Sequence, residues 1–577
     1  MKKLMLGNAA VASGLKDAGC KLVSSYPGTP STEITEYAVK YKKDIHCEWA
    51  PNEKVAMETA IGASFAGARA FCAQKHVGLN VAADPLFTLS YTGVNGGLVI
   101  AVADDPGMHS SQNEQDSRHY ARAAKVLMLE PSNSQECYDY AKLAFVLSEQ
   151  FDTPVLLRLS TRVSHSTSLV ERSNDGNGKL KEYEKNPGKY VMMPAMAKTR
   201  HEVIEKRYSA EKVWSENSDI NTVEMNDKKI GIIAAGITYE YAKEALGNKA
   251  SYLKLGCVYP LPAKLITDFA KKVETLYVLE QLDPFVENYC KTLGLDVRGK
   301  EEFSLLGEYS QALIKKVILG EEVEYIESGL EIPGRPPVLC AGCPHRGLFT
   351  ALKQLDVFVS GDIGCYTLSS LPPLEMMDTC VCMGASISAL HGRNIVRPDE
   401  AKKSVAVIGD STFMHSGILG LVNIAYNRTN SKVIVLDNSI TGMTGHQQNP
   451  TTGKRIDGEP TTAVDLTALA HAVGIERVVV VDPYDIPATK AAIAAELEIE
   501  APSLIISRRP CALLKEVKHN PPFSIDTDKC IGCKACMKIG CPAIKMSGEK
   551  SVIDFTQCVG CGMCTSFCKF DAIKEGK

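Results

Sequence analysis

The sequence predicts a multidomain α/β protein in which three parallel-sheet domains precede a small, cysteine-rich module. At roughly 150 residues per domain, a chain of 577 residues suggests about four globular units. Short apolar runs alternate with helical patterns along most of the chain, which is typical of parallel strands covered by helices. Eight of the 20 cysteines lie between Cys530 and Lys577, so the last part of the chain differs from the rest.

The composition disfavours several functional classes. Hydrophobic residues make up 45% of the chain and charged residues 23%, which is typical of a globular protein. With 64 basic and 68 acidic side chains the net charge is −4, so no overall basic field favours nucleic acid as a partner. The longest uncharged stretch, 85–103, is broken by polar residues and glycines, and the first twenty residues do not resemble a signal peptide. We therefore expect a cytoplasmic enzyme without a membrane or nucleic-acid partner.

The first predicted domain covers residues 1–185, and a connector follows at 186–227. Short apolar runs predict its strands at 21–26, 70–74, 98–104, 126–131 and 154–160. Helical patterns occupy 31–43 and 52–70 between them. The stretch that begins near Arg172 is rich in Asn, Gly, Lys, Glu and Tyr, which predicts a polar connector that crosses the surface.

Two further α/β domains are predicted beyond the connector. Residues 228–328 show a short series of strands and helices, which we interpret as a scaffold domain. A proline-rich hinge at 332–338 leads into a larger domain at 333–520, and residues 521–577 form the tail module. The strands of the larger domain are predicted at 358–364, 404–411, 432–439, 477–483 and 503–510.

The cysteine spacing in the tail predicts two [4Fe-4S] clusters. In each of two runs three cysteines are spaced by three, which lets one loop supply three thiolates while the fourth cysteine of the run binds the other cluster. Zinc knuckles are the alternative, but eight cysteines without histidine in two matched runs resemble bacterial-type ferredoxins. The first run has four residues before its last cysteine where the usual pattern has three. The predicted ligand sets are Cys530, Cys533, Cys536 and Cys568 for one cluster, and Cys558, Cys561, Cys564 and Cys541 for the other.

The larger domain carries a candidate site for a diphosphate and Mg²⁺. Gly409, Asp410 and Ser411 follow one predicted strand, and Asn438 follows the next. Ligands bind at the carboxyl ends of parallel strands, and carboxylate and amide oxygens suit a hard cation. We predict Asp410, Asn438 and the carbonyl of Ile440 as the ligands. The arrangement resembles the thiamine diphosphate motif, written GDS and DN here; an ordinary turn with a capping aspartate is the alternative.

The first domain supplies a candidate catalytic acid, Glu53. The segment 51–70 resembles the one that carries the activating glutamate of thiamine enzymes. The cofactor needs a carboxyl group beside its aminopyrimidine to move a proton. A solvated glutamate in the first turn of a helix is the alternative interpretation.

Taken together, these pieces resemble the 2-oxoacid:ferredoxin oxidoreductases over nearly the whole chain. The resemblance is carried by segments 26–32, 48–56, 75–85, 103–118, 340–347, 360–368, 409–417 and 437–447. It implies two thiamine-diphosphate-binding domains, one for the pyrimidine (1–185) and one for the diphosphate (333–520). It also implies a transketolase C-terminal-like domain at 228–328 and a ferredoxin domain with two clusters at 521–577.

The resemblance further implies oxidative decarboxylation of a 2-oxoacid with coenzyme A, with electrons passed through iron–sulfur clusters to ferredoxin. The expected substrates are aryl pyruvates: indolepyruvate, phenylpyruvate and hydroxyphenylpyruvate. Another 2-oxoacid, such as pyruvate or phenylglyoxylate, is the alternative, and so is an electron-transfer or scaffold subunit with a vestigial thiamine site. A gamma-type domain is not found in the sequence, so we expect a smaller beta subunit in an α2β2 assembly and an anaerobic host. The active site is expected where the two thiamine domains meet, within one chain or across a dimer.

The same resemblance suggests residues that bind the substrate. Thr29 matches a threonine near the substrate carboxylate in the pyruvate enzymes; a helix-capping role for Thr29 or Ser31 is the alternative. The arginine that those enzymes use after a later strand has no counterpart here, so His76 or His109 is expected to replace it. Gly28 leaves room for an aryl group, although a tight turn explains a glycine equally well.

A third, proximal cluster is also suggested by the resemblance. Four cysteines match, one by one, those that hold a cluster near thiamine in the pyruvate enzymes; buried or free thiols are the alternative. Cys380 and Cys382 are interpreted as packing residues. The four matching cysteines are Cys340, Cys343, Cys365 and Cys511.

Overall fold

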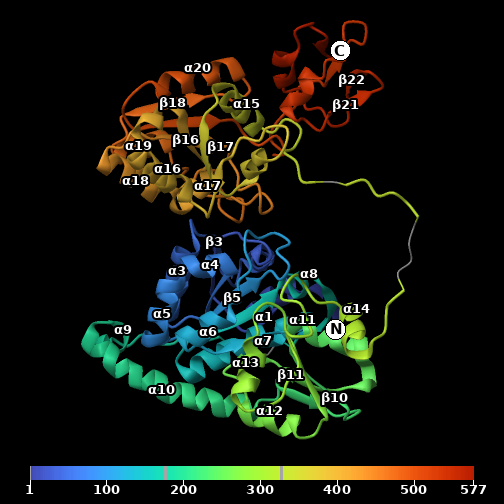
Figure 1. Ribbon diagram of the computed structural model, residues 1–577. Helices are drawn as coiled ribbons and strands as arrows, with labels where there is room; N and C mark the ends of the chain where they lie inside the picture. Colours follow the sequence, from blue (N-terminus) through green and yellow to red (C-terminus); the bar gives the residue numbers. More distant parts are fainter. Residues whose placement is uncertain (1, 174–177, 325–328, 335, 577) are drawn as a thin grey trace. The chain divides into compact units, whose positions relative to one another are not determined.

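The computed structural model describes residues 2–173, 178–324, 329–334 and 336–576 (Figure 1). The chain divides into two compact units, Met1–Gly329 and Leu330–Lys577. The predicted boundary near residue 328 and Arg335 of the predicted hinge lie outside the described residues. Within the described ranges, no helix has the length and apolarity that crossing a lipid bilayer requires.

The first unit is built on a seven-stranded sheet with the order β12-β6-β7-β5-β4-β2-β3. All neighbouring strands are parallel except β12, which runs antiparallel to β6. Its strands are β2 (Leu22–Ser25), β3 (His46–Trp49), β4 (Ala70–Lys75), β5 (Leu98–Asp104), β6 (Met128–Leu129), β7 (Val155–Ser160) and β12 (Cys257–Tyr259). β1 (Lys2–Leu6) and β8 (Thr167–Glu171) form a separate antiparallel pair. The five strands predicted for this domain are therefore present.

Helices cover both faces of this sheet and enclose two apolar cores. One core is formed with α1 (Gly7–Asp17), α2 (Thr32–Ala38) and α7 (Ser134–Phe151). The other involves α3 (Glu53–Phe65), α4 (His76–Val81), α5 (Ala83–Thr92) and α6 (Arg118–Ala124). The second core continues into the next domain, because Ile233, Leu253 and Phe285 belong to it as well. The two sheets of the first unit thus share one apolar core.

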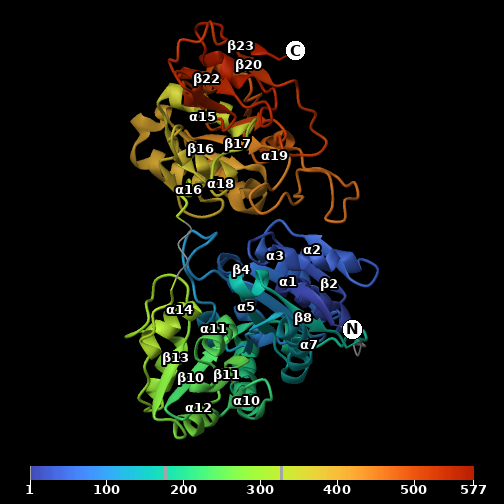
Figure 2. The same cartoon turned by 90° about the vertical axis from the view of Figure 1, so that its right-hand side faces the viewer.

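The small domain contains a four-stranded sheet of order β13-β10-β11-β9 (Figure 2). β10 (Ile230–Ala235), β11 (Ser251–Leu255) and β13 (Thr275–Leu279) are parallel, and β9 (Thr222–Glu224) is an antiparallel edge. Its helices are α11 (Gly236–Leu246), α12 (Ala263–Ala270), α13 (Phe285–Thr292) and α14 (Gln311–Ile314). The apolar run 251–262 is divided between two strands: β11 stays in this sheet and β12 joins the first.

The predicted connector contains regular structure. Beyond α9 (Pro187–Tyr190), a 24-residue helix, α10 (Pro194–Asn217), packs on α5 and α12 (Figure 1). β9 at the end of the same stretch pairs with β11. The stretch 186–227, predicted as a polar connector that crosses the surface, therefore contains a long helix that its polar composition did not indicate.

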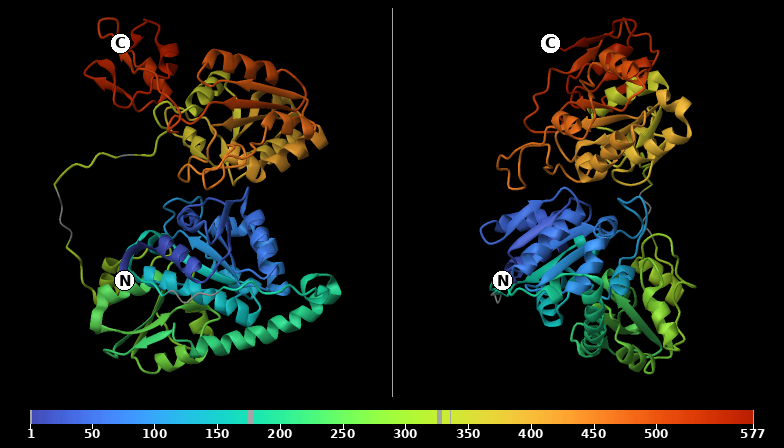
Figure 3. Two further views of the ribbon diagram at one scale, coloured as in Figure 1. Left: turned by 180° about the vertical axis from the view of Figure 1, so that it is seen from behind. Right: turned by 90° about the vertical axis from the view of Figure 1, so that its left-hand side faces the viewer.

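The second unit contains a parallel six-stranded sheet of order β15-β14-β16-β17-β19-β18 (Figure 3). The strands are β14 (Phe358–Gly361), β15 (Thr379–Cys380), β16 (Ser404–Gly409), β17 (Lys432–Asp437), β18 (Arg477–Val481) and β19 (Ser503–Arg508). The main helices are α15 (His345–Leu355), α16 (Ala385–Val396), α18 (Ile418–Asn427), α19 (Leu466–Ala472) and α20 (Ile486–Leu497), and the short α17 (Asp410–Thr412) follows β16. Every strand predicted here is present.

The tail module packs on the sheet domain of the second unit. It contains two antiparallel pairs, β20 (Phe523–Ile525) with β23 (Ile573–Glu575), and β21 (Ile544–Ser547) with β22 (Lys550–Ile553). Single helical turns at Ala535–Ile539 and Met563–Phe567 carry cysteines. Apolar residues of the tail join Ala351 of α15 and Ile486 of α20 in one cluster. The tail is thus held by an apolar contact with the sheet domain.

Candidate functional site

Asp410 and Asn438 lie at the carboxyl ends of adjacent parallel strands, as predicted. The register of β16 and β17 pairs Gly409 with Leu436, so Asp410 and Asp437 follow at the same edge of the sheet. Asp410 is only 2% exposed, and its carboxylate accepts hydrogen bonds from the backbone N–H of Ser411 (2.8 Å) and the hydroxyl of Thr451 (3.2 Å). Ile440 is buried beside them, and its N–H lies 3.4 Å from Oδ1 of Asn438.

The electrostatics of this edge suit a divalent cation. Burial and, next, the neighbouring Asp437 raise the pKa of Asp410 to about 7. Two buried carboxylates and an amide oxygen at one edge form an oxygen donor set of the kind that Mg²⁺ prefers. Asp437 itself accepts a hydrogen bond from Nε of Arg508 (2.8 Å). The residues present therefore fit a cation that carries a diphosphate.

The sequence did not indicate two residues that support Asp410. The hydroxyl of Thr451 lies within hydrogen-bond distance of Asp410 (3.2 Å) and of Oδ1 of Asn449 (2.7 Å), and its N–H donates to the same Oδ1 at 2.9 Å. Both belong to the long loop between β17 and α19. A loop some forty residues beyond the GDS motif gives no local signal for such a contact.

Glu53 is the first residue of α3 and is only 4% exposed. The helix is capped by Asn52, whose side chain accepts a hydrogen bond from the N–H of Val55 (2.9 Å). Gly78 of α4 packs directly on the Glu53 side chain, because a Cβ at position 78 would lie 2.6 Å from Cγ of Glu53. The alternative of a solvated glutamate is therefore wrong.

Gly28 and Thr29 form a loop after β2, beside the end of β4. Ser31 uses its hydroxyl to donate to the carbonyl of Gly28 (2.8 Å), and the N-terminus of α2 has no side-chain cap. The alternative of a capping role for Thr29 or Ser31 is therefore wrong. Thr29 is partly buried, and the Cβ of Lys75 lies 3.1 Å from where a Cβ on Gly28 would be.

The two predicted histidines have different surroundings. His76 begins α4 and is buried, and burial lowers the pKa of its imidazole. His109 is exposed, and its Nε2 lies 3.3 Å from a carboxylate oxygen of Glu308 in the small domain. The imidazole of His109 thus already contacts a carboxylate.

Lys75 is a candidate that the sequence analysis missed. It is only 8% exposed, and its ammonium donates to the carbonyl of Ser110 (2.5 Å). Burial lowers the pKa of Lys75 to about 8, although Asp105 acts in the opposite direction. The sequence contains no signal for this burial, because Lys75 is simply a lysine at the end of an apolar run.

The four cysteines proposed for a proximal cluster lie close together in the second unit. Cys365 interacts electrostatically with Cys511 and Cys340, and Cys343 with Cys365 and Cys340. A Cβ on Gly442 would lie 3.3 Å from Sγ of Cys365 and 3.9 Å from Nδ2 of Asn438. These thiols, which we call the inner set, therefore adjoin the Asp410 site.

The tail cysteines border two separate cavities. One is lined by Cys541, Cys558, Cys561 and Cys564, together with Ala341, Gly342 and Arg346 of the sheet domain. The other is lined by Cys530, Cys533, Cys536 and Cys568 and by other residues of the tail. Each cavity thus gathers the four thiols predicted for one cluster, including the cysteine exchanged between the two runs.

Among the described residues, one group of three metal-binding side chains has all its ligand atoms within 4.8 Å of one another: Asp116, His119 and Asp283.

Cys380 and Cys382 are both exposed. The interpretation of these two cysteines as packing residues was therefore wrong. Cys380 ends the edge strand β15 and Cys382 lies just beyond it, and among the described residues no further strand pairs with β15 on that side.

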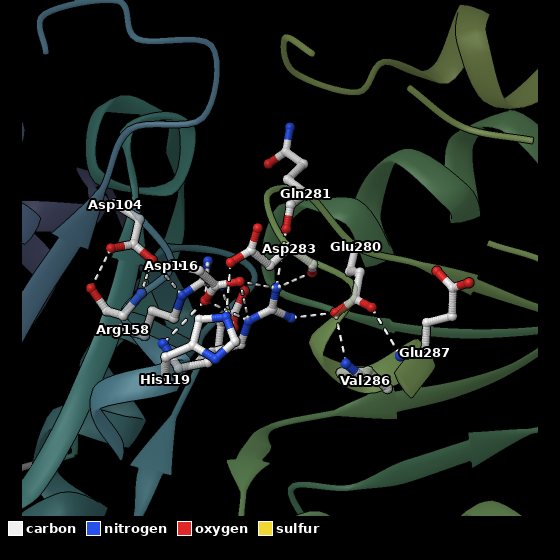
Figure 4. A network of polar contacts seen from close by, with 12 residues as sticks. Asp104, Asp116, His119, Arg158, Glu280, Gln281, Asp283, Val286 and Glu287 are labelled. Carbon is white, nitrogen blue, oxygen red and sulfur yellow. Dashed lines mark hydrogen bonds and ion pairs between the residues drawn. The ribbon is translucent and has the colours of Figure 1, made fainter. Parts of the chain in front are cut away.

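Part of the segment 103–118 forms a buried ionic network in the first unit (Figure 4). Arg118 bonds Asp116 through Nη2 (2.5 Å) and Glu280 of the small domain through Nη1 (2.5 Å). Arg158 bonds Asp104 (2.8 Å) and Glu130 (2.7 Å). Because Arg118 occupies both oxygens of Asp116, we interpret Asp116, His119 and Asp283 as part of this network and not as a metal site.

Comparison with known proteins gives three family models, in the order of the predicted domains. "Pyruvate flavodoxin/ferredoxin oxidoreductase, thiamine diP-bdg" matches residues 13–231. "Thiamine pyrophosphate enzyme, C-terminal TPP binding domain" matches residues 362–507. "4Fe-4S dicluster domain" matches residues 523–569. The chain therefore has thiamine-binding domains and a dicluster domain.

Curated relatives match over the full length of the chain. Indolepyruvate oxidoreductase subunit IorA of Archaeoglobus fulgidus is 40% identical over 100% of this chain and 98% of its own length. The protein of the same name from Thermococcus kodakarensis is 41% identical over 100% of this chain and 97% of its own. A solved structure of 2-oxoglutarate:ferredoxin oxidoreductase from Magnetococcus marinus covers 55% of this chain and 65% of its own at 16% identity, with a TM-score of 0.47. On the strength of the full-length relatives, the chain belongs to the indolepyruvate oxidoreductase subunit IorA family.

Proposed function

We propose that the chain is the thiamine-binding, electron-transferring subunit of an enzyme that oxidatively decarboxylates aryl pyruvates with coenzyme A and reduces ferredoxin. The observation that carries this proposal is the match of its whole length with indolepyruvate oxidoreductase subunits at 40% identity. The proposed substrates are indolepyruvate, phenylpyruvate and hydroxyphenylpyruvate, and the products are the aryl-acetyl-CoA and CO₂.

Asp410, Asn438 and the carbonyl of Ile440 would hold Mg²⁺, and Gly409 and Ser411 would face the diphosphate. The buried oxygen atoms at this edge support the assignment. Thiamine diphosphate, when bound, supplies a thiazolium carbon that attacks a keto carbon once it is deprotonated. The proposed role of Glu53 is to move a proton at the aminopyrimidine, and its burial keeps water from competing for that proton.

Lys75 is proposed to bind the substrate carboxylate, with Thr29 and His76 beside it. The burial of its ammonium and the close approach of its Cβ to Gly28 support this role, because the attraction between a cation and a carboxylate is stronger where water is excluded. The contact of His109 with the carboxylate of Glu308 makes His109 the weaker candidate for an anchor.

Electrons are proposed to pass through three [4Fe-4S] clusters. Cys340, Cys343, Cys365 and Cys511 would hold the proximal one, and their proximity supports this. The two tail sets would hold the others, and the two cavities that they line support that pairing. Iron and sulfide analysis of the reconstituted chain is expected to give about twelve iron atoms. A value of about eight would contradict the proximal cluster alone.

The remaining assignments concern the assembly. The small domain at 228–328 is proposed to be transketolase C-terminal-like, which its parallel strands support. A smaller beta subunit with the gamma-type domain is proposed to complete an α2β2 enzyme and to take part in coenzyme A binding. The subunit designation of the relatives supports a further subunit.

A substrate panel tests the proposed function. The complex with its beta subunit is assayed anaerobically with coenzyme A and methyl viologen as the electron acceptor. The three aryl pyruvates are expected to reduce the dye faster than pyruvate or phenylglyoxylate. Faster reduction with pyruvate would assign another 2-oxoacid, and clusters that load fully while no 2-oxoacid reduces the dye would indicate an electron-transfer subunit.

A further inference from the structure

Arg346 lies in the segment 340–347, and the proposed function gives it no role. It belongs to α15, and only 2% of it is exposed. Its guanidinium donates to four backbone carbonyls: those of Leu339 and Cys340 (3.3 Å) on its own side, and those of Ile539 (3.1 Å) and Gly540 in the tail. One side chain therefore bonds both modules of the second unit.

The tail loop that Arg346 binds is the one with unusual spacing. Cys536 and Cys541 are separated by four residues, and the last two of these, Ile539 and Gly540, provide the carbonyls. Gly540 adopts a φ of +68°, and a Cβ there would lie 2.8 Å from Pro373 and 3.2 Å from Nη1 of Arg346. The longer loop and its glycine thus bring two carbonyl oxygens to the guanidinium.

The charge of Arg346 lies among thiols of two sets. It interacts electrostatically with Cys340 and Cys343 of the inner set and with Cys541 and Cys561 of the tail. The cavity lined by the Cys541 set has Arg346 in its wall, whereas the cavity of the Cys530 set is lined by tail residues alone. A fixed positive charge in this position favours an added electron on a nearby cluster.

The backbone contact beside Arg346 is close. A Cβ on Gly342 would lie 2.1 Å from Val559 of the tail, and the carbonyl of Gly342 accepts a hydrogen bond from the hydroxyl of Tyr484 (2.6 Å). The loop at 339–343, which we call the inner loop, therefore contacts the tail directly, and the guanidinium of Arg346 lies beside this contact.

We propose that Arg346 is a positioning residue for electron transfer: it fixes the 536–541 loop of the tail against the inner loop and raises the reduction potential of the two clusters that flank it. The inference rests on the proposed clusters, because the charge acts on reduced iron. It goes beyond the proposed function in assigning the docking and the redox tuning of these clusters to one residue.

The test compares Arg346→Gln, Arg346→Lys and the control Lys538→Gln in the full-length chain with reconstituted clusters. Lys538 is an exposed residue of the same loop, so its variant removes a charge without touching the contact. Redox titration followed by electron paramagnetic resonance gives each midpoint potential, and hydrogen exchange reports on the amides of the 536–541 loop.

Arg346→Gln is expected to lower the reduced-to-oxidised ratio of the inner and Cys541 clusters about tenfold at a fixed potential, which is about 59 mV for one electron. The Cys530 cluster should shift much less and serves as the internal reference. Arg346→Lys keeps the positive charge, so the midpoint potentials of the two clusters should change little. Hydrogen exchange in the 536–541 loop should become faster, because an ammonium cannot reproduce the planar hydrogen-bonding geometry of a guanidinium. Lys538→Gln should change neither quantity.

Equal shifts of all three clusters, or no shift at all, in Arg346→Gln would overturn the proposal. If Arg346→Gln does not retain iron, the proposal is tested with Arg346→Lys alone. Unchanged hydrogen exchange in its 536–541 loop would overturn the docking role. Eight iron atoms in the unmodified chain would remove the proximal cluster from the proposed function, and the Arg346 test would then be read on the Cys541 cluster.

Discussion

Glu53 combines burial with a position at the start of a helix, and a single substitution tests its proposed role. Glu53→Gln keeps the size of the side chain but cannot exchange a proton, so reduction of methyl viologen by aryl pyruvates should fall at least about 100-fold. Cluster spectra should be unchanged. Glu58→Gln, which alters an exposed glutamate of the same helix, is the control and should retain full activity. Retained activity in Glu53→Gln would remove Glu53 from the proton transfer.

The proposed role of Lys75 predicts that kcat/KM depends on pH in a definite direction. Its pKa of about 8 means that the ammonium is charged below that pH and neutral above it. If the charge binds the substrate carboxylate, kcat/KM should fall as the pH rises through about 8, because this ratio reports on the free enzyme. Lys75→Arg should shift this fall to higher pH, and Lys75→Met should raise KM below about pH 8, where the ammonium of the unmodified chain is charged. A fall in kcat/KM that occurs at the same pH in Lys75→Arg would contradict the assignment.

For single residues, the sequence indicated the functional side chains that lie within motifs. It did not indicate the side chains that only folding brings to the site. Asp410 and Asn438 were predicted because strand ends meet at one edge of a parallel sheet. Thr451 and Asn449 were not predicted, since their contact with Asp410 depends on the path of a long loop. Lys75 was missed because a lysine after an apolar run has the same appearance whether it is buried or exposed.

Among the elements, α10 differs most from its prediction. Arg207 of this helix donates to the carbonyls of Ser90, Lys125 and Asp152 in the first domain. Periodicity of apolar residues reveals helices that pack through hydrophobic side chains, whereas this one is anchored by an arginine. The polar composition of the segment therefore suggested a connector.

Glu211 of α10 makes the stability of the first unit dependent on pH. Burial raises the pKa of Glu211 to about 7 from an ordinary value of 4.5. Between these values the folded chain binds a proton that the unfolded chain lacks, so stability should fall as the pH rises from 5 to 8, by about 3 kcal/mol at 1.36 kcal/mol per pKa unit. Glu211→Gln should lose much less stability over this range.

Tryptophan fluorescence can follow this change selectively, because both tryptophans, Trp49 and Trp214, lie in the first unit. The denaturation midpoint is measured at pH 5 and pH 8. Glu205→Gln, at an exposed position of the same helix, serves as the control and should behave like the unmodified chain. An identical pH dependence in Glu211→Gln would show that another group is responsible.

For the molecule as a whole, the Arg118 network joins the two sheet domains of the first unit (Figure 4). Arg118→Met would leave Asp116 and Glu280 buried without their cation, which is expected to cost about 3–5 kcal/mol. Arg122→Met is the control, since Arg122 is exposed and stacks on Phe285. Tryptophan fluorescence during denaturation should show a much lower midpoint for Arg118→Met only. Equal midpoints for the two variants would mean that the network contributes little.

The order of the domains could be predicted from the alternation of strands and helices and from the cysteine runs. Which of the two sheets each strand joins could not be predicted from the sequence. The run 251–262 reads as one strand, yet Leu255 ends β11 in one sheet and Cys257 begins β12 in the other. The apolar pattern predicts only that a strand is buried. Because both sheets bury strands in one shared core, the pattern does not distinguish between them.

The edge strand β12 also affects how the chain can be made. The first sheet lacks its last strand until Tyr259 has been synthesised, because β12 pairs with β6 across more than a hundred residues of sequence. At a rate of about 5–20 residues per second, a ribosome leaves that edge open for several seconds. An open sheet edge invites pairing with another chain. A gene fragment that stops before the small domain would carry this edge permanently, and efforts to express the first domain should extend through it.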